Sequence, residues 1–189
     1  MTRSPEGAAA AHLYRLGVDV ARATSASLDR RRLGEPGPIE ARLAEGLDRV
    51  FGGVGRRPDA LTVTDSRRSD LYVASHEPVG STQLRELYAR LEGGAPRTFA
   101  LEIERDDAVI RRLLRVDGAA LRQAVDGAAA AATLRPDGVL AALASEARRT
   151  SGETFEPADR ARELGDAWRR RQRLGGRPVV LAAHGAGDG

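Results

Sequence analysis

The residues with the clearest spacing for metal chemistry are acidic side chains in the segment 97–118. Glu102 and Glu104 alternate with apolar residues, so both carboxylates project from one face of an expected strand, and Asp106 follows at its end. Closely spaced carboxylates bind Mg²⁺ or Mn²⁺ and can position a metal-activated water for hydrolysis. Arginines within 105–112 stand near enough to neutralise these carboxylates, which favours a salt-bridged sheet face. A metal site at Glu102, Glu104 and Asp106 is therefore the less favoured interpretation.

A basic cluster further along the chain has the composition of a phosphate-binding surface. It reads Trp-Arg-Arg-Arg-Gln-Arg, so four guanidinium groups stand beside one aromatic ring. Guanidinium groups bind phosphate oxygens and aromatic rings stack on bases, which indicates DNA or RNA binding. The same residues also fit a helix end that carries its tryptophan on the core side and its cations near the negative pole of the helix. The residues that we predict for nucleic-acid binding are Trp168, Arg169, Arg170, Arg171 and Arg173.

Missing residue types exclude several classes of enzyme. The chain has no Cys and no Lys, so all 30 of its basic residues are Arg. Without Lys there is no P-loop lysine and no Schiff-base chemistry, and without Cys there is no thiolate nucleophile, thiolate zinc site or disulfide. Of the three histidines, His76 between Ser75 and Glu77 has the best surroundings for a general base, but such a loop histidine is more often simply solvated. We therefore predict no catalytic residue and no cofactor.

The overall charge and hydropathy are those of an ordinary globular chain. The 189 residues include 27 acidic side chains, and the net charge is only +3, so composition alone favours nucleic acid weakly. The N-terminus does not read as a signal peptide, and no apolar stretch is long enough to cross a bilayer. We expect a cytoplasmic protein without a membrane partner.

Helices are expected where apolar residues recur every three or four positions. An Ala-rich helix is predicted over residues 6–23, where Leu13, Leu16 and Val20 would form the apolar stripe, although Gly17 weakens it. Further helices are predicted over residues 38–51, 82–92, 119–134, 137–149 and 157–174.

Two hairpins are predicted to build a small antiparallel sheet. The first covers residues about 60–75, where an alternating run and a second, apolar run flank a polar turn. The second covers residues about 98–116 and turns at Asp106-Asp107. Residues 108–116 also fit a helix that begins after Asp106, because their apolar side chains share one helical stripe. We favour the hairpin, because several of these residues are β-branched and an Asp-Gly turn follows.

These elements together predict an α+β fold in which a small antiparallel sheet packs against several helices. Residues 1–176 would form a single domain with a helical N-terminal segment (6–51) and an Arg-rich C-terminal helix (157–174). Residues 177–189 would form a short strand and a disordered tail.

The function that fits these residues best is a non-enzymatic cytoplasmic protein-binding or accessory module. Its partner would be another protein or a second copy of the chain, docked on a sheet edge or on alanine-rich helix faces. A DNA- or RNA-binding protein that uses the Arg-rich helix is the alternative. A metal-dependent hydrolase that uses the acidic strand face is a further alternative.

Overall fold

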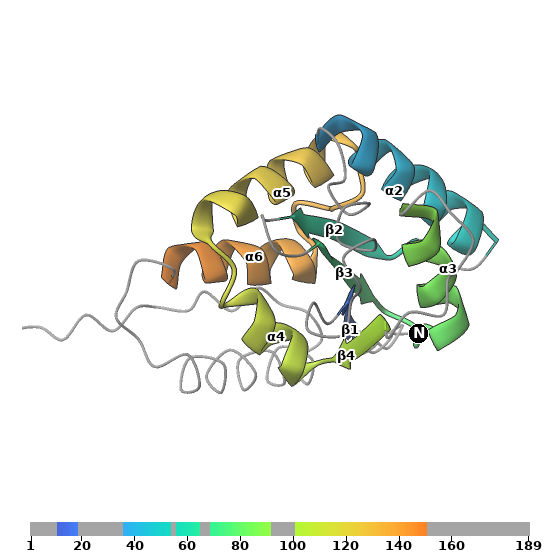
Figure 1. The fold of residues 1–189 in the computed structure, drawn as a ribbon, viewed down its shortest axis with the longest axis horizontal. Coiled ribbons are helices and arrows are strands. Elements are labelled where there is room, and N and C mark those ends of the chain that lie inside the picture. The colour runs from blue at the N-terminus through green and yellow to red at the C-terminus, as the bar shows by residue number, and fades with distance from the viewer. Residues whose placement is uncertain (1–10, 19–35, 54–55, 65–68, 92–100, 151–189) are drawn as a thin grey trace, which may run out of the picture.

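A four-stranded antiparallel sheet forms the centre of the computed structural model, and helices cover both of its faces (Figure 1). The α+β class and the small antiparallel sheet that the sequence predicts are therefore confirmed. The structure describes residues 11–18, 36–53, 56–64, 69–91 and 101–150.

The order of the elements along the chain is that of a ferredoxin-like motif followed by three helices. The first six described elements alternate as strand, helix, strand, strand, helix and strand, and the sheet order is β2-β3-β1-β4. The elements are β1 (His12–Val18), α2 (Pro36–Phe51), β2 (Asp59–Thr64), β3 (Ser69–Ser75), α3 (Ser81–Leu91), β4 (Leu101–Arg105), α4 (Asp107–Leu113), α5 (Gly118–Ala130) and α6 (Val139–Thr150).

Strand β1 lies in the middle of the sheet and pairs with β3 on one side and with β4 on the other. Arg15 stands opposite Tyr72 of β3 and opposite Glu104 of β4, while Gly17 stands opposite Glu102. Residues that face one another across antiparallel strands project to the same side of the sheet. This register therefore brings polar side chains from three strands to one face.

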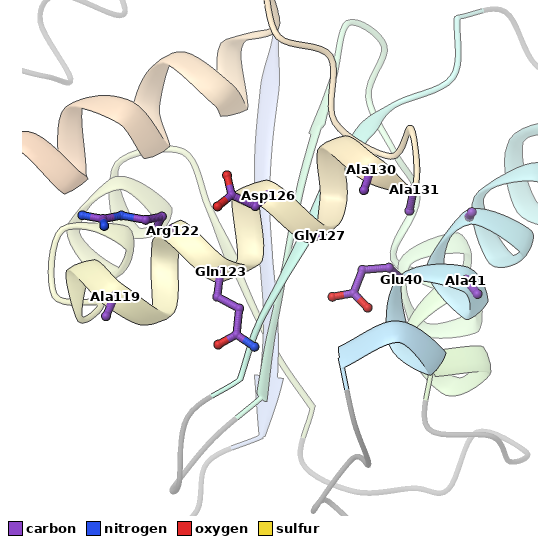
Figure 2. A pocket seen from close by; sticks show the side chains of 10 residues that line it. Glu40, Ala41, Ala119, Arg122, Gln123, Asp126, Gly127, Ala130 and Ala131 are labelled. Carbon is purple, nitrogen blue, oxygen red and sulfur yellow. The ribbon is translucent and has the colours of Figure 1, made fainter.

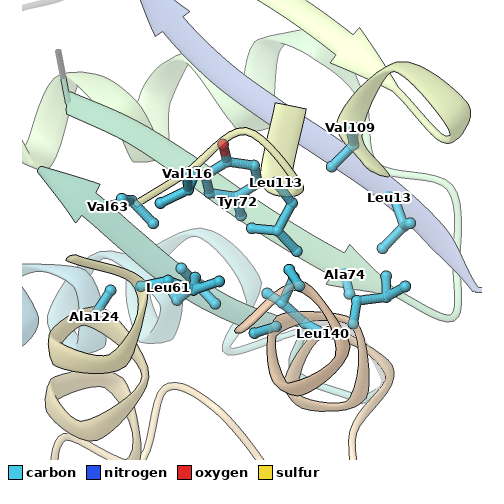
Figure 3. Close-up of a cluster of buried hydrophobic side chains, with 14 of the residues drawn as sticks. Leu13, Leu61, Val63, Tyr72, Ala74, Val109, Leu113, Val116, Ala124 and Leu140 are labelled. Atoms are coloured by element: carbon cyan, nitrogen blue, oxygen red, sulfur yellow. The ribbon is translucent and has the colours of Figure 1, made fainter. Parts of the chain in front are cut away.

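Two apolar layers enclose the sheet. Helices α2 and α3 cover the face that carries Leu16 and Leu71, and helices α4, α5 and α6 cover the face that carries Leu13, Leu61 and Tyr72. In Figure 3, Tyr72 lies among side chains from the strands and from the segment after α4. Each fully buried leucine contributes about 1.5–3 kcal/mol relative to an exposed one, so both layers contribute to stability.

The predicted N-terminal helix is wrong over residues 12–18, which form strand β1. Leu13 and Leu16 fit a helical stripe, but Leu13 and Tyr14 point to opposite faces of the sheet and each enters a different core. Because β3 and β4 supply backbone partners on both sides, tertiary pairing overrides the helix propensity of the alanines nearby. Residues 6–10 and 19–23 of that prediction lie outside the described ranges.

The second predicted hairpin is also wrong, because the chain enters helix α4 directly after β4. Strand β4 pairs with β1 and is the edge strand of the described sheet. Val109, Ile110 and Leu113 share the helical stripe of the alternative prediction and are buried against the sheet. The change of direction occurs at Asp106, whose φ is 46°.

The other predicted elements within the described ranges are confirmed. The first hairpin corresponds to β2 and β3, and the four helices near 38–51, 82–92, 119–134 and 137–149 correspond to α2, α3, α5 and α6. The predicted Arg-rich helix at 157–174 and the segment 177–189 lie outside the part of the chain that the structure describes.

Candidate functional site

The most concentrated group of charges in the described fold surrounds Arg15, a residue of the central strand that is only 2% exposed. One guanidinium nitrogen, Nη2, donates to Oδ1 of Asp70 at 2.6 Å. The other, Nη1, lies 3.3 Å from a carboxylate oxygen of Glu102 and 3.3 Å from one of Glu104. A buried charge is tolerated when it is paired and hydrogen-bonded, and both Nη atoms of Arg15 have carboxylate partners. Its Nε is buried without a hydrogen-bond partner among the described residues.

Gly17 provides the space that the Arg15–Asp70 pair occupies. A Cβ atom at position 17 would overlap both the Asp70 carboxylate and the Arg15 guanidinium. Glycine therefore sits in a strand interior, where it normally weakens a sheet, because the side chain of a neighbouring residue needs the room.

Helix α4 closes the outer side of this ionic cluster, which comprises Arg15, Asp70, Glu102, Glu104 and Arg112. The Arg112 side chain reaches Glu104 at 3.4 Å and Glu102 at 3.9 Å. Burial by itself lowers the pKa of Arg15, but the hydrogen bond and charge of Asp70, together with the charge of Glu104, outweigh it and raise this pKa above its usual value. Arg15 therefore stays protonated, and its charge holds the carboxylates in place.

The three predicted metal ligands do not converge. Glu102 and Glu104 lie on one strand face, as the alternation predicts, but both contact Arg15 and Arg112. The Asp106 carboxylate turns instead to β1, where it accepts the Leu13 N–H at 3.2 Å. Across the described ranges, no group of three His, Cys, Asp or Glu side chains is arranged to hold a metal ion.

Sequence reasoning missed Arg15 because it stands in a mainly apolar run, and Asp70 because it directly follows a polar turn. A signal was present, since Leu13, Arg15 and Gly17 alternate with Tyr14 and Leu16 in the two-residue period of a strand. A charged residue at an inward position of a strand implies a partner of opposite charge on an adjacent strand. The identity of that partner follows only from the register.

A second buried ion pair fastens the loop between α5 and α6 to the start of β2. Asp59 is 3% exposed, and Arg135 binds it with two parallel contacts, Nε to Oδ1 at 2.7 Å and Nη2 to Oδ2 at 2.9 Å. The hydrogen bond with Asp59 outweighs partial burial and raises the pKa of Arg135. This pair positions α5 beside β2, and α5 in turn forms one wall of a groove.

This open groove of about 970 Å³ runs between α2 and α5 (Figure 2). Its lining is mostly small side chains, so the two helices present a shallow, largely apolar trough. Glu40 extends from α2 toward α5 at Gly127, where a Cβ atom would lie 2.7 Å from Glu40 Oε1. The lining residues are Glu40, Ala41, Ala44, Ala119, Arg122, Gln123, Asp126, Gly127, Ala130 and Ala131.

Glu40 is the polar residue of the groove with an unmet hydrogen-bonding requirement. Its Oε2 atom is buried and has no hydrogen-bond partner among the residues that the structure describes. A buried acceptor without a donor is costly, typically by about 1–3 kcal/mol. The Glu40 carboxylate would have to turn toward the groove before a bound N–H or O–H group could reach this oxygen.

The remaining candidate residues within the described ranges show no arrangement that indicates a function. His76 is partly buried just after β3, and the Glu77 N–H donates to Ser75 Oγ at 3.3 Å, so this segment forms a local turn. Trp168 and the arginines at 169, 170, 171 and 173 lie outside the described part of the chain. The described ranges contain equal numbers of arginine and acidic residues, so the excess positive charge of the chain belongs to the other segments.

Comparison with known proteins finds one solved structure with a similar fold among those that match. Neither a family model nor a curated protein matches the sequence. A solved structure, glutamyl-tRNA reductase from Methanopyrus kandleri, is similar with a TM-score of 0.50 and 20% sequence identity. The similarity covers 80% of this chain and 34% of that enzyme, so the chain spans about a third of the enzyme's length. At this identity the likeness concerns the fold alone.

A helix that crosses a bilayer must be both long and predominantly apolar. None of the helices within the described ranges combines these two properties.

Proposed function

We propose that the chain is a non-enzymatic cytoplasmic module that binds a protein through the groove between α2 and α5. The observation that carries this proposal is the groove itself, an open and mainly alanine-lined trough with a buried, unsatisfied carboxylate oxygen on Glu40. Small side chains allow another helix to approach closely. A partner with an N–H or O–H group would satisfy the Glu40 carboxylate.

The ionic cluster supports a binding role over a catalytic one. Its carboxylates are engaged in ion pairs with Arg15 and Arg112, so their oxygens already have partners within the fold. The cluster serves to join β1, β3, β4 and α4, and thereby keeps the sheet rigid beneath the helices.

The test fills the groove and compares the result with a matched change elsewhere. Ala41→Trp places a large side chain in the groove, whereas Ala142→Trp makes the same change on the exposed face of α6, outside the groove. A partner is first identified by affinity capture on the full chain, with native copies of the chain counted as partners. Its affinity for each purified variant is then measured by calorimetry.

We expect Ala41→Trp to weaken this affinity by at least about tenfold and Ala142→Trp to leave it unchanged, because only the first change blocks the trough. Equal affinity for both variants would place the binding surface elsewhere and refute the proposal. Circular dichroism checks that both variants keep the fold.

RNA binding is a second candidate, favoured by one observation. The similar solved structure is named as an enzyme that acts on glutamyl-tRNA, and the excess positive charge of this chain lies in segments that include Trp168 and the arginines at 169, 170, 171 and 173. An arginine-rich segment attached to a neutral folded domain would contact phosphates without base specificity.

This candidate is tested with fluorescently labelled tRNA at two salt concentrations. Replacing Arg169, Arg170, Arg171 and Arg173 by Gln should abolish binding and flatten the salt dependence, because each phosphate contact releases counterions. The matched control replaces four exposed arginines outside the groove, Arg56, Arg85, Arg111 and Arg115, by Gln and should bind like the wild type. Absence of binding by the wild-type chain at low salt would eliminate the candidate.

A further inference from the structure

We infer that the surface formed by the outward face of α5 is a self-association site, on which a second copy of this chain docks with its own α5 antiparallel to the first. The inference rests on the proposed protein-binding function and names the partner. The outward face of α5 carries alanines at both ends and a charged pair in the middle. Its exposed residues are Ala119, Arg122, Gln123, Asp126, Ala129 and Ala130.

The charges on this face are complementary to themselves. Arg122 and Asp126 stand one helical turn apart, and no hydrogen bond or ion pair joins either of them to another described residue. In a two-fold symmetric pair each contact occurs twice, with the roles of the two copies exchanged. If two α5 helices cross antiparallel near residue 124, Arg122 of each copy faces Asp126 of the other. Both charges of both copies are then paired.

The small residues around this charge pair permit the close approach that the pairing needs. In the same antiparallel register Ala119 of one copy faces Ala129 of the other, so only methyl groups separate the helix backbones at the two ends. Helices with small residues at their contact pack at the short end of the usual 8–10 Å range.

The pattern favours a second copy over an unrelated protein. To pair with Arg122 and Asp126, a helix of another protein would need an acidic residue opposite Arg122 and a basic residue opposite Asp126. An antiparallel copy of α5 already has this arrangement. The alanines likewise follow the palindromic order that an antiparallel self-contact requires.

The experiment measures the mass of the full-length chain in solution and then exchanges the charges. Sedimentation equilibrium over a range of concentrations should show the wild type at twice its monomer mass of 20.2 kDa. Arg122→Asp and Asp126→Arg, studied singly, should each weaken self-association by at least about 100-fold, because each places two pairs of like charges in contact. Arg85→Asp, a matched charge reversal on the exposed surface of α3, should leave the dimer intact.

Mixing the two α5 variants gives the decisive result. One partner then carries two basic residues and the other two acidic residues, so both ion pairs re-form and a heterodimer should appear at wild-type affinity. A monomeric wild type, or dimers that survive either single reversal, would overturn the inference, as would a mixture that stays monomeric while circular dichroism shows both variants folded. The wild type could be monomeric while Ala41→Trp still weakens binding of a captured partner. That result would refute the identification of the partner as a second copy but would support the proposed function.

Discussion

Arg15 collects polar side chains from three strands and one helix around a single buried guanidinium. Asp70 is its closest partner and is 1% exposed, whereas the side chain of Glu102 is 49% exposed and contacts it from the rim. The two carboxylates therefore contribute differently. Coulomb attraction is strong where water is excluded and weak where solvent screens it.

Removing Asp70 should be far more harmful than removing Glu102. We expect Asp70→Ala to lower the free energy of unfolding by about 3–5 kcal/mol, because Arg15 would stay buried without its main counter-charge. Glu102→Ala should lower it by less than about 1 kcal/mol. Urea unfolding followed by circular dichroism measures both values. Equal losses in the two variants would contradict the difference in burial.

A neighbouring position gives a second test of the same cluster. Alanine is normally better than glycine in a strand, by roughly 0.5–1 kcal/mol. At position 17 we expect alanine to be less stable than glycine, since the new methyl group would displace Arg15 from Asp70. Thermal unfolding of Gly17→Ala should therefore occur several degrees below that of the wild type. Gly53→Ala, which meets no atom within 4 Å, is the control and should not unfold earlier.

At the scale of elements, periodicity predicts helices whose core residues are close in sequence. Ile39, Leu43, Leu47 and Phe51 recur every four positions and all are buried, so the amino-acid pattern by itself predicts α2. Strand β1 is different, because its two partners, β3 and β4, come from distant parts of the chain. The residues near β1 in the sequence do not indicate which distant strands it pairs with.

Helix α4 shows the same difficulty in a shorter segment. Its buried residues satisfy both a strand and a helix pattern, and the outcome depends on the sheet face that α4 covers, which is built from strands distant in sequence. The groove between α2 and α5 depends on how two helices lie in space and on Gly127 facing Glu40. No pattern within one helix predicts either feature.

The end of α5 has a backbone conformation that its residue does not favour. Ala132 has a φ of 54°, in the left-handed region, and it is exposed. Glycine adopts this conformation without the steric cost, so Ala132→Gly should raise the free energy of unfolding by about 0.5–1 kcal/mol. Ala142→Gly, at an exposed position inside α6, should lower it by about 1 kcal/mol. Differential scanning calorimetry compares the two, and destabilisation by both would refute the effect of φ.

At the scale of the whole molecule, the sheet is enclosed by two apolar layers that are joined at α2 and α5. Strands β1 and β3 are buried on both faces and paired on both edges, while β4 has one paired edge among the described strands and is only partly buried. The interior of the sheet should therefore open only when the molecule unfolds as a whole.

Hydrogen exchange tests this gradient directly. We expect the amides of β1 and β3 to exchange most slowly and at a rate set by global unfolding, and those of β4 to exchange sooner through local opening. Mass spectrometry of peptides from 12–18, 69–75 and 101–105 resolves the three strands. Slower exchange in β4 than in β1 would contradict this prediction, because it would mean that β4 is protected by contacts other than its pairing with β1.

The ionic cluster also specifies strand register. Sliding β1 by two residues against its neighbours would keep every apolar side chain on its proper face, so hydrophobic burial alone discriminates poorly against that error. A slip that puts Arg15 in the place of Leu13 would, however, move it about 7 Å from Asp70 and surround it with apolar side chains. The opposite slip would put Arg15 in the place of Gly17, where a side chain would overlap the Asp70 carboxylate. A single buried arginine beside a glycine thus makes one alignment of the sheet far more favourable than the others, in a chain whose leucines and alanines would accept several.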